Sequence, residues 1–180
     1  MWEKNDIKEV LVTEEQIQTR AKELGAQITK DYSEKNPLVV GLLRGSVPFM
    51  ADLIKNIDLD IQFDTMDVSS YEGTQSVGEI RILKDLDTAV NGLDIILVED
   101  IVDTGKTLNT VKNTLLHRGA KSVKICTLLN KAARRTIDIK ADYIGFEVGD
   151  EFVIGYGMDF DQKYRCLPYV GVLKPECYEK

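Results

Sequence analysis

The chain has 180 residues, 43% of them hydrophobic, and a net charge of −7, which is the composition of a globular protein with a real core. This acidic balance argues against general nucleic-acid binding, which needs a basic face. No apolar run approaches the roughly 18 residues of a membrane span, and the polar start shows no signal peptide. We therefore expect a cytoplasmic protein with no membrane partner, in which Cys126, Cys166 and Cys177 are reduced thiols.

The first third of the chain alternates between helix and strand patterns. Residues 13–30 carry apolar positions on one helical face, and Thr13 and Gln16 can form a capping box at its start. The elements that follow are a buried strand at 38–43, a helix from about 46 to 57 with Pro48 in its first turn, and a strand at 61–68. A polar, glycine-containing segment at 72–78 then leads to a short strand at 79–83. This pattern predicts a long hairpin with a mobile tip, which can act as a lid.

The most informative segment is 95–107. An apolar run at 95–98, typical of a strand buried on both faces, passes into the adjacent carboxylates Glu99 and Asp100. The sequence Asp103–Thr107 then opens a helix at 105–118, where backbone N–H groups form a ready site for phosphate. Carboxylates for hydroxyls or a metal, followed by an anion site, suit a ribose that carries a 5′-phosphate.

The ending of this segment also invites comparison with the P-loop of nucleoside-triphosphate enzymes. That motif needs a second glycine five positions before Gly105, where this chain has Asp100. An acidic strand end before an ordinary helix is the plain structural alternative, but it explains neither the adjacent carboxylates nor Asp103. The segment instead resembles the phosphoribosyl-diphosphate motif of the type I phosphoribosyltransferases.

The remaining chain contains a strand at 123–129, which ends at Asn130-Lys131, and short strands near 142–147, 152–156 and 169–173. Strand–helix alternation over the first 130 residues predicts the α/β class with a doubly wound, mainly parallel sheet. We expect the C-terminal strands to build a small subdomain over its ligand-binding edge. Polar residues at 43–46, 68–71, 99–103 and 129–131 should gather along that edge, because parallel strands point the same way.

Taken as a whole, the chain resembles the bacterial hypoxanthine-guanine phosphoribosyltransferases. The matching segments are 42–46, 69–71, 95–107, 128–131 and 152–159, with Arg165 and the ending 173–176. The resemblance implies one type I phosphoribosyltransferase domain over 1–180, with a core at about 10–150. It also implies a hood from about 151 to 180 joined by the N-terminal residues, and a mobile hairpin lid. The implied reaction moves 5-phosphoribosyl from phosphoribosyl diphosphate to N9 of hypoxanthine or guanine, giving IMP or GMP and pyrophosphate, with Mg²⁺ as cofactor.

The resemblance also implies roles in binding phosphoribose. Glu99 and Asp100 would hold the ribose hydroxyls, directly or through Mg²⁺, and Asp103 would be the general base beside N7 of the purine. An aspartate with an ordinary pKa is a weak base at neutral pH, so Asp103 would accept a hydrogen bond and follow the proton. Thr104, Gly105, Lys106 and Thr107 would cradle the 5′-phosphate, although Lys106 could equally be a solvated helix side chain.

For the purine, the resemblance implies that Lys131 recognises O6, which favours 6-oxopurines over adenine. Phe152 would stack on the base, Val153 would bond its Watson–Crick edge through the backbone, and Asp159 would lie at this pocket and bind a second Mg²⁺. The plain structural alternative is a surface lysine after a strand for Lys131, and read without the resemblance Phe152 is more often a core side chain.

For pyrophosphate, the family uses a loop that corresponds to Leu43-Arg44-Gly45, often with a non-proline cis peptide, and Arg165. Ser70 and Tyr71 would close with the lid. Arg135 either helps near the pyrophosphate or forms a solvated pair with Arg134. The resemblance suggests a homodimer or homotetramer, with Arg44 and its helix near the interface.

Two alternatives stay open at this point. One is a regulator on the same scaffold that binds RNA without turnover, which the charge of −7 disfavours. The other is a preference for xanthine or adenine within the same enzyme class; adenine would need a different group at Lys131. The choice between hypoxanthine and guanine is not predicted.

Overall fold

The computed structural model describes residues 4–70 and 80–179. Their main sheet has six strands in the order β4-β3-β2-β5-β6-β7. The strands β2 (Leu38–Leu43), β3 (Gln62–Ser70), β5 (Asp94–Val102), β6 (Ser122–Asn130) and β7 (Tyr143–Glu147) run parallel, and β4 (Ile80–Lys84) pairs antiparallel to β3. The predicted α/β fold with a mainly parallel sheet is therefore confirmed.

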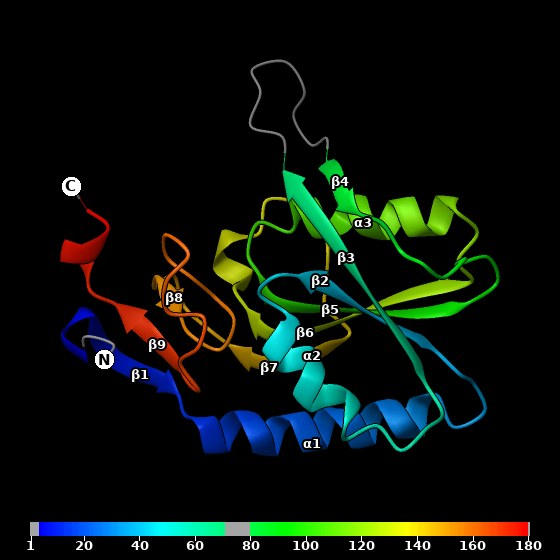
Figure 1. Cartoon of the computed structure of the whole chain (residues 1–180), viewed down its shortest axis with the longest axis horizontal. Helices are drawn as coiled ribbons and strands as arrows, with labels where there is room; N and C mark the ends of the chain where they lie inside the picture. The colour runs from blue at the N-terminus through cyan, green and yellow to red at the C-terminus, as the bar shows by residue number, and fades with distance from the viewer. Residues whose placement is uncertain (1–3, 71–79, 180) are drawn as a thin grey trace.

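Helices cover both faces of this sheet (Figure 1). The helices α1 (Glu14–Asp31) and α2 (Val47–Ile54) lie on one face, and α3 (Lys106–His117) lies on the other. The side chains of residues 95–98 in β5 are fully buried, with alternate residues in the two cores. This double coverage explains why the strand reads as a continuous apolar run.

The predicted start of α1 is confirmed in detail. The Thr13 hydroxyl accepts a hydrogen bond from the Gln16 amide at 3.2 Å, and the Gln16 side chain accepts one from the Thr13 amide at 2.8 Å. The end of α2 differs from the prediction, because the helix stops at Ile54 instead of residue 57. The Asn56 side-chain amide donates a hydrogen bond to the Asp52 carbonyl at 2.8 Å, and the Asn56 backbone amide donates one to the Leu53 carbonyl. These two bonds close the end of the helix.

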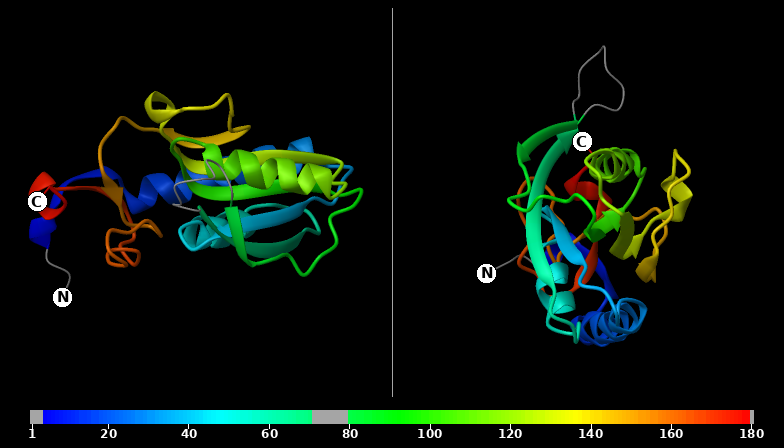
Figure 2. Two further views of the ribbon diagram at one scale, coloured as in Figure 1. Left: turned by 90° about the horizontal axis from the view of Figure 1, so that it is seen from above. Right: turned by 90° about the vertical axis from the view of Figure 1, so that its right-hand side faces the viewer.

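A second sheet of three antiparallel strands lies beside the carboxyl end of the main sheet (Figures 1 and 2). It contains β1 (Ile7–Val12), β9 (Val170–Leu173) and β8 (Val153–Ile154), in that order, and both chain ends lie near it. We call this sheet with its connecting loops the hood. Three short 3-10 helices complete the described elements, at Lys4–Asp6, Ala132–Arg134 and Pro175–Cys177.

Two expectations about these strands were wrong. The strand at 142–147 was expected in the C-terminal subdomain, but β7 extends the main sheet parallel to β6. In this pairing, Tyr143 and Ile144 of β7 lie beside Cys126 and Thr127 of β6. The strand β1 had not been anticipated, because its burial comes from β9, some 160 residues later in the chain.

The predicted hairpin is present as β3 and β4, which pair from Asp67–Lys84 to Ser70–Ile80. Its predicted tip at 72–78, and Tyr71 with it, lies outside the described residues. Ser70 ends β3.

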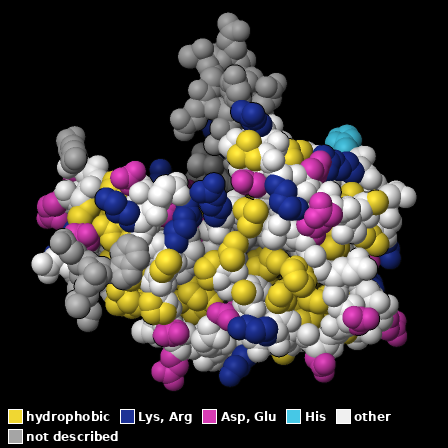
Figure 3. Space-filling view, in the orientation of Figure 1, with side chains coloured by type: hydrophobic (Ala, Val, Ile, Leu, Met, Phe, Trp, Pro, Cys, Tyr) yellow, Lys and Arg dark blue, Asp and Glu magenta, His cyan; other side chains and the backbone are white. Residues whose placement is uncertain are grey.

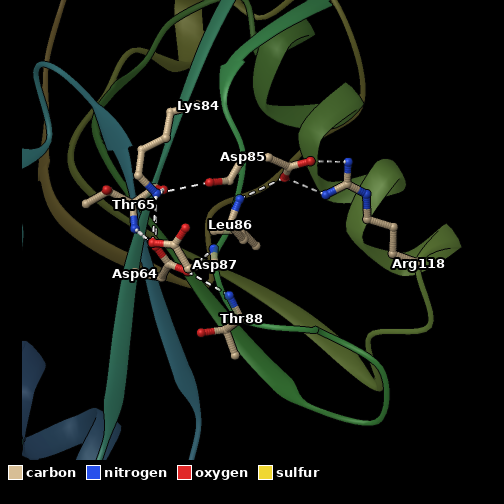
Figure 4. Close-up of polar contacts among 8 residues, drawn as sticks. All are labelled: Asp64, Thr65, Lys84, Asp85, Leu86, Asp87, Thr88 and Arg118. Carbon is tan, nitrogen blue, oxygen red and sulfur yellow. Dashed lines mark hydrogen bonds and ion pairs between the residues drawn. The ribbon is translucent and has the colours of Figure 1, made fainter.

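A buried carboxylate fixes the connection from β4 to β5 (Figure 4). Asp64 on β3 accepts hydrogen bonds from the amides of Thr65, Asp87 and Thr88 at 2.7–3.2 Å, and from the Lys84 ammonium at 3.3 Å. Burial by itself raises the pKa of Asp64, but these hydrogen bonds outweigh it and hold the pKa below its ordinary value. The connection is also tied to the end of α3, where Arg118 forms a bidentate ion pair with Asp85.

In the part of the chain that the structure describes, no helix covers one face of β3 and β4. Along β3, Asp64 and Met66 are buried toward α3, whereas Phe63 is 60% exposed on the opposite face. Leu83 on β4 and Val47 on α2 are also about half exposed. Figure 3 shows hydrophobic side chains gathered over this region. Within the described residues, no helix is long and apolar enough to cross a membrane.

Candidate active site

A cavity of about 230 Å³ lies between the carboxyl edge of the main sheet and the hood. Its lining comes from the end of β5, from the turn after β6 and from the hood. The lining residues are Asp100, Ile101, Asp103, Lys131, Arg134, Phe152, Val153, Met158 and Asp159. Six of these nine are residues that the sequence had proposed for one site, although they lie up to 59 positions apart.

The carboxylates of β5 lie inside the strand, since β5 runs on to Val102. Asp100 lines the cavity, and its side chain packs against Gly45: a Cβ added there would lie 1.7 Å from Asp100 Oδ2. The absence of a side chain at Gly45 therefore lets the loop after β2 approach this carboxylate closely. Glu99 does not line the cavity. Desolvation and the adjacent Asp100 carboxylate both raise the pKa of Glu99 well above its ordinary value.

Asp103 begins the turn between β5 and α3. Within 4–70 and 80–179, its Oδ1 is buried without a hydrogen-bond partner, and it lies 3.5 Å from Nε of Arg134. This distance gives electrostatic attraction but no hydrogen bond, so the oxygen keeps its capacity to accept a proton donor. The turn ends at Gly105, whose left-handed conformation (φ 82°) starts α3 at Lys106. The first amides of α3 have no acceptor within the helix, which makes this end attractive to an anion. Lys106 itself is exposed.

Lys131 follows β6 directly and is 4% exposed, so its alternative reading as a surface lysine was wrong. Its Nζ donates a hydrogen bond to the Glu151 carbonyl at 2.8 Å and lies 3.8 Å from Asp150 Oδ1. Arg134 lies 3.5 Å from the same Asp150 oxygen. A donor cation thus stands at the cavity wall, held by the backbone of the residue before Phe152.

Phe152 lines the cavity and belongs to an aromatic cluster in the hood. Its ring stacks on Tyr178 with centroids 4.9 Å apart and meets the edge of Phe160 at 5.6 Å. Sequence reasoning missed the contribution of Tyr178, because nothing in the local pattern near the C-terminus ties it to residue 152. Val153, the next residue, begins β8 and is buried.

The predicted pyrophosphate residues lie beside the cavity without lining it. The Leu43–Arg44 peptide bond is cis, as the resemblance implied, and Arg44 is exposed. Arg165 forms an ion pair with Asp159 at 2.7 Å and donates to the Gly157 carbonyl at 2.7 Å. Asp159 also accepts a hydrogen bond from the Gln162 amide at 2.8 Å. The two charged residues proposed for the leaving group and the metal are therefore paired with each other.

Arg134 and Arg135 differ sharply in their surroundings, so they do not form the solvated pair that was one alternative. Arg134 is exposed at the cavity wall. Arg135 donates to the carbonyls of Val102, Asp103 and Ile139 at 2.7–3.2 Å, and to the Asn130 side chain at 2.6 Å. It ties the turn after β5 to the turn after β6, a supporting role that its position in the sequence does not reveal.

The donor set at this edge consists of carboxylate oxygens, which suit magnesium. Among the described residues, no three His, Cys, Asp or Glu side chains are grouped as a metal cage. Magnesium often binds through one or two carboxylates together with water and substrate phosphates, so Glu99 and Asp100 fit such a shared site.

Comparison with known proteins defines the class. Residues 11–161 match the family model for the phosphoribosyl transferase domain. The chain therefore belongs to the phosphoribosyl transferase family, as the motifs indicated.

The relatives are more specific. The chain is 57% identical to the hypoxanthine-guanine phosphoribosyltransferase of Lactococcus lactis subsp. lactis, with 100% of both chains covered. It is 55% identical to the enzyme of the same name from Bacillus subtilis, with 98% of both chains covered. It is also similar to the crystal structure of a hypoxanthine phosphoribosyltransferase from Staphylococcus aureus. The TM-score is 0.94, the identity is 52%, and 98% of this chain and 96% of that chain are covered.

Proposed function

We propose that this protein transfers the 5-phosphoribosyl group of phosphoribosyl diphosphate to N9 of hypoxanthine or guanine, with release of pyrophosphate. The observation that carries the proposal is the single cavity in which Asp103, Lys131 and Phe152 meet. The names of relatives more than 50% identical over nearly the whole chain support it.

The purine would lie against Phe152, with its O6 accepting a hydrogen bond from Lys131. A buried ammonium that donates to one carbonyl keeps two further protons for a ligand. The 6-amino group of adenine would meet this donor unfavourably, which supports a 6-oxopurine. Val153 would bond the Watson–Crick edge through its backbone, and Asp159 would close this side.

The ribose phosphate would extend from the purine along the end of β5. The amides of Thr104, Gly105, Lys106 and Thr107 would bind the 5′-phosphate at the start of α3. Glu99 and Asp100 would hold the ribose hydroxyls, directly or through a magnesium ion, and Asp159 would contact a second ion through water. Magnesium would supply charge neutralisation for the diphosphate.

Pyrophosphate would leave toward Gly45, Arg44 and Arg165. Arg165 would exchange part of its pairing with Asp159 for the phosphate oxygens. The reacting carbon gains positive charge as its bond to the diphosphate breaks, so anion stabilisation by these groups contributes most to the rate. Asp103 would hold the proton of the purine N7 as the new bond forms at N9. Closure of the lid with Ser70 and Tyr71 would exclude water.

The test is product formation by purified protein with phosphoribosyl diphosphate, Mg²⁺ and each of hypoxanthine, guanine, xanthine and adenine. We expect IMP and GMP, and much slower turnover of adenine. Absence of product from both hypoxanthine and guanine would refute the proposal. Salt-dependent RNA binding without turnover would instead favour a regulator.

We further propose that the chain acts as one domain, cytoplasmic, and as a homodimer or homotetramer. One hydrophobic cluster contains residues of both the hood and the main sheet, such as Val153 and Ile96, which supports a single domain. Cys126, Cys166 and Cys177 are all free thiols, which suits a reducing compartment. The uncovered sheet face around Phe63 and Leu83 supports self-association, because parallel sheets are normally covered on both faces.

A further inference from the structure

The hood reaches the site through a sharply turned segment after β8. Gly155, Tyr156 and Gly157 all have left-handed backbone conformations, with φ of 93°, 47° and 100°. Glycine adopts this conformation freely, but a tyrosine rarely does. The backbone amides of Tyr156 and Gly157 hold the turn through hydrogen bonds to the carbonyls of Leu167 at 2.8 Å and Arg165 at 3.0 Å, and the Tyr156 side chain adds contacts of its own.

Those contacts lead to the core. Tyr156 is 5% exposed, and its hydroxyl donates a hydrogen bond to the Asp52 carboxylate on α2. The same carboxylate accepts from Gln18 of α1 at 2.5 Å and from Lys55 at 2.6 Å. Burial by itself raises the pKa of Asp52, but the hydrogen bonds from Lys55, Tyr156 and Gln18 outweigh burial and hold the pKa below its ordinary value. The carboxylate therefore stays ionised and is a strong acceptor.

On its other side, the turn touches the groups proposed for the diphosphate. A Cβ at Gly157 would lie 1.9 Å from the Gly45 carbonyl oxygen, so the two backbones are in direct contact. The Gly157 carbonyl also receives the hydrogen bond from Arg165. The next residues, Met158 and Asp159, line the cavity. The position of this turn therefore sets the space between the cavity wall and the Gly45 loop.

We propose that Asp52 and Tyr156 form a positioning pair, which anchors the hood turn against α2 and so fixes the contact of Gly157 with the Gly45 loop, beside which the diphosphate would bind. The inference rests on the proposed function. Neither residue lines the cavity, so both act through the turn. The consequence is specific: loss of the hydroxyl should weaken use of phosphoribosyl diphosphate much more than it weakens the chemical step.

The experiment compares Tyr156→Phe with Tyr143→Phe. Tyr143 also donates its hydroxyl to a carboxylate, that of the exposed Asp31 at 2.9 Å, but it joins β7 to α1 away from the cavity. We expect Tyr156→Phe to raise KM for phosphoribosyl diphosphate about fivefold or more with kcat within about twofold. Tyr143→Phe should leave both values near wild type although it removes a similar bond. Asp52→Asn keeps an acceptor for the tyrosine and should give a smaller rise than Tyr156→Phe.

Hydrogen exchange of the amides at 155–158 gives a readout without turnover. We expect faster exchange in Tyr156→Phe and no change in Tyr143→Phe. Equal KM values for the two variants, or unchanged exchange at the turn, would overturn the positioning role while wild-type activity leaves the proposed function standing. A wild-type protein inactive on both 6-oxopurines would overturn the proposed function. The hydrogen-exchange data would then still test whether Tyr156 and Asp52 hold the turn at 155–158.

Discussion

The sharpest prediction concerns the ammonium of Lys131. Its side chain is almost fully buried at the cavity wall, and its ammonium donates one hydrogen bond to the Glu151 carbonyl. Lys131→Met keeps the unbranched stem and removes the donor, so a bound 6-oxopurine loses a charge-assisted hydrogen bond. Such a bond contributes about 1.5–3 kcal/mol, which corresponds to a loss of about 10- to 150-fold in kcat/KM for hypoxanthine and guanine.

Lys131→Met should also lower the ratio of kcat/KM for hypoxanthine to kcat/KM for adenine, because the variant lacks the ammonium that disfavours the 6-amino group of adenine. The assay is steady-state kinetics with hypoxanthine, guanine and adenine, alongside thermal melting. The matched control is Lys124→Met, which also removes an ion-paired ammonium (2.7 Å to Asp142), but on the surface. Wild-type kcat/KM for hypoxanthine and an unchanged preference over adenine in folded Lys131→Met would refute the reasoning.

The remaining predictions concern the general base, acid stability and assembly. Asp103→Asn should lower kcat by about 10²- to 10⁴-fold with little change in either KM, and a kcat close to wild type in a steady-state assay would exclude the role of general base. Because the folded pKa of Asp64 is depressed, its contribution to the free energy of unfolding is present above the unfolded pKa and lost as pH falls through the lower folded value. Asp64→Asn should therefore cost about 1–3 kcal/mol at neutral pH and flatten the loss of stability below about pH 4, as measured by urea unfolding across pH; parallel pH profiles would contradict this. Phe63→Glu should dissociate the proposed oligomer in sedimentation experiments, and an unchanged mass would move the interface elsewhere.

Much of this site can be predicted from short stretches of the amino-acid sequence. The carboxylates of β5, the turn at 103–105 and the start of α3 are contiguous in the chain, and parallel strands must place their ends together. These elements could be predicted because short-range rules of burial, glycine conformation and helix termini decide them. The boundaries of α1 and β2 followed from the same rules.

Other features depend on contacts between distant segments. Nothing around Arg135 distinguishes it from Arg134, yet one ties two turns together and the other lines the cavity. Strand β7 went to the main sheet because β6 offered it an open edge.

The amino-acid sequence by itself determined the class of fold, the acidic end of β5 before α3 and the set of residues at the strand ends. The tertiary structure alone decided which distant charges pair, such as Arg118 with Asp85, and how the hood meets α2 through Tyr156. The physical reason is range: backbone preference and hydrophobic periodicity act over a few residues, whereas these contacts join residues far apart in the chain.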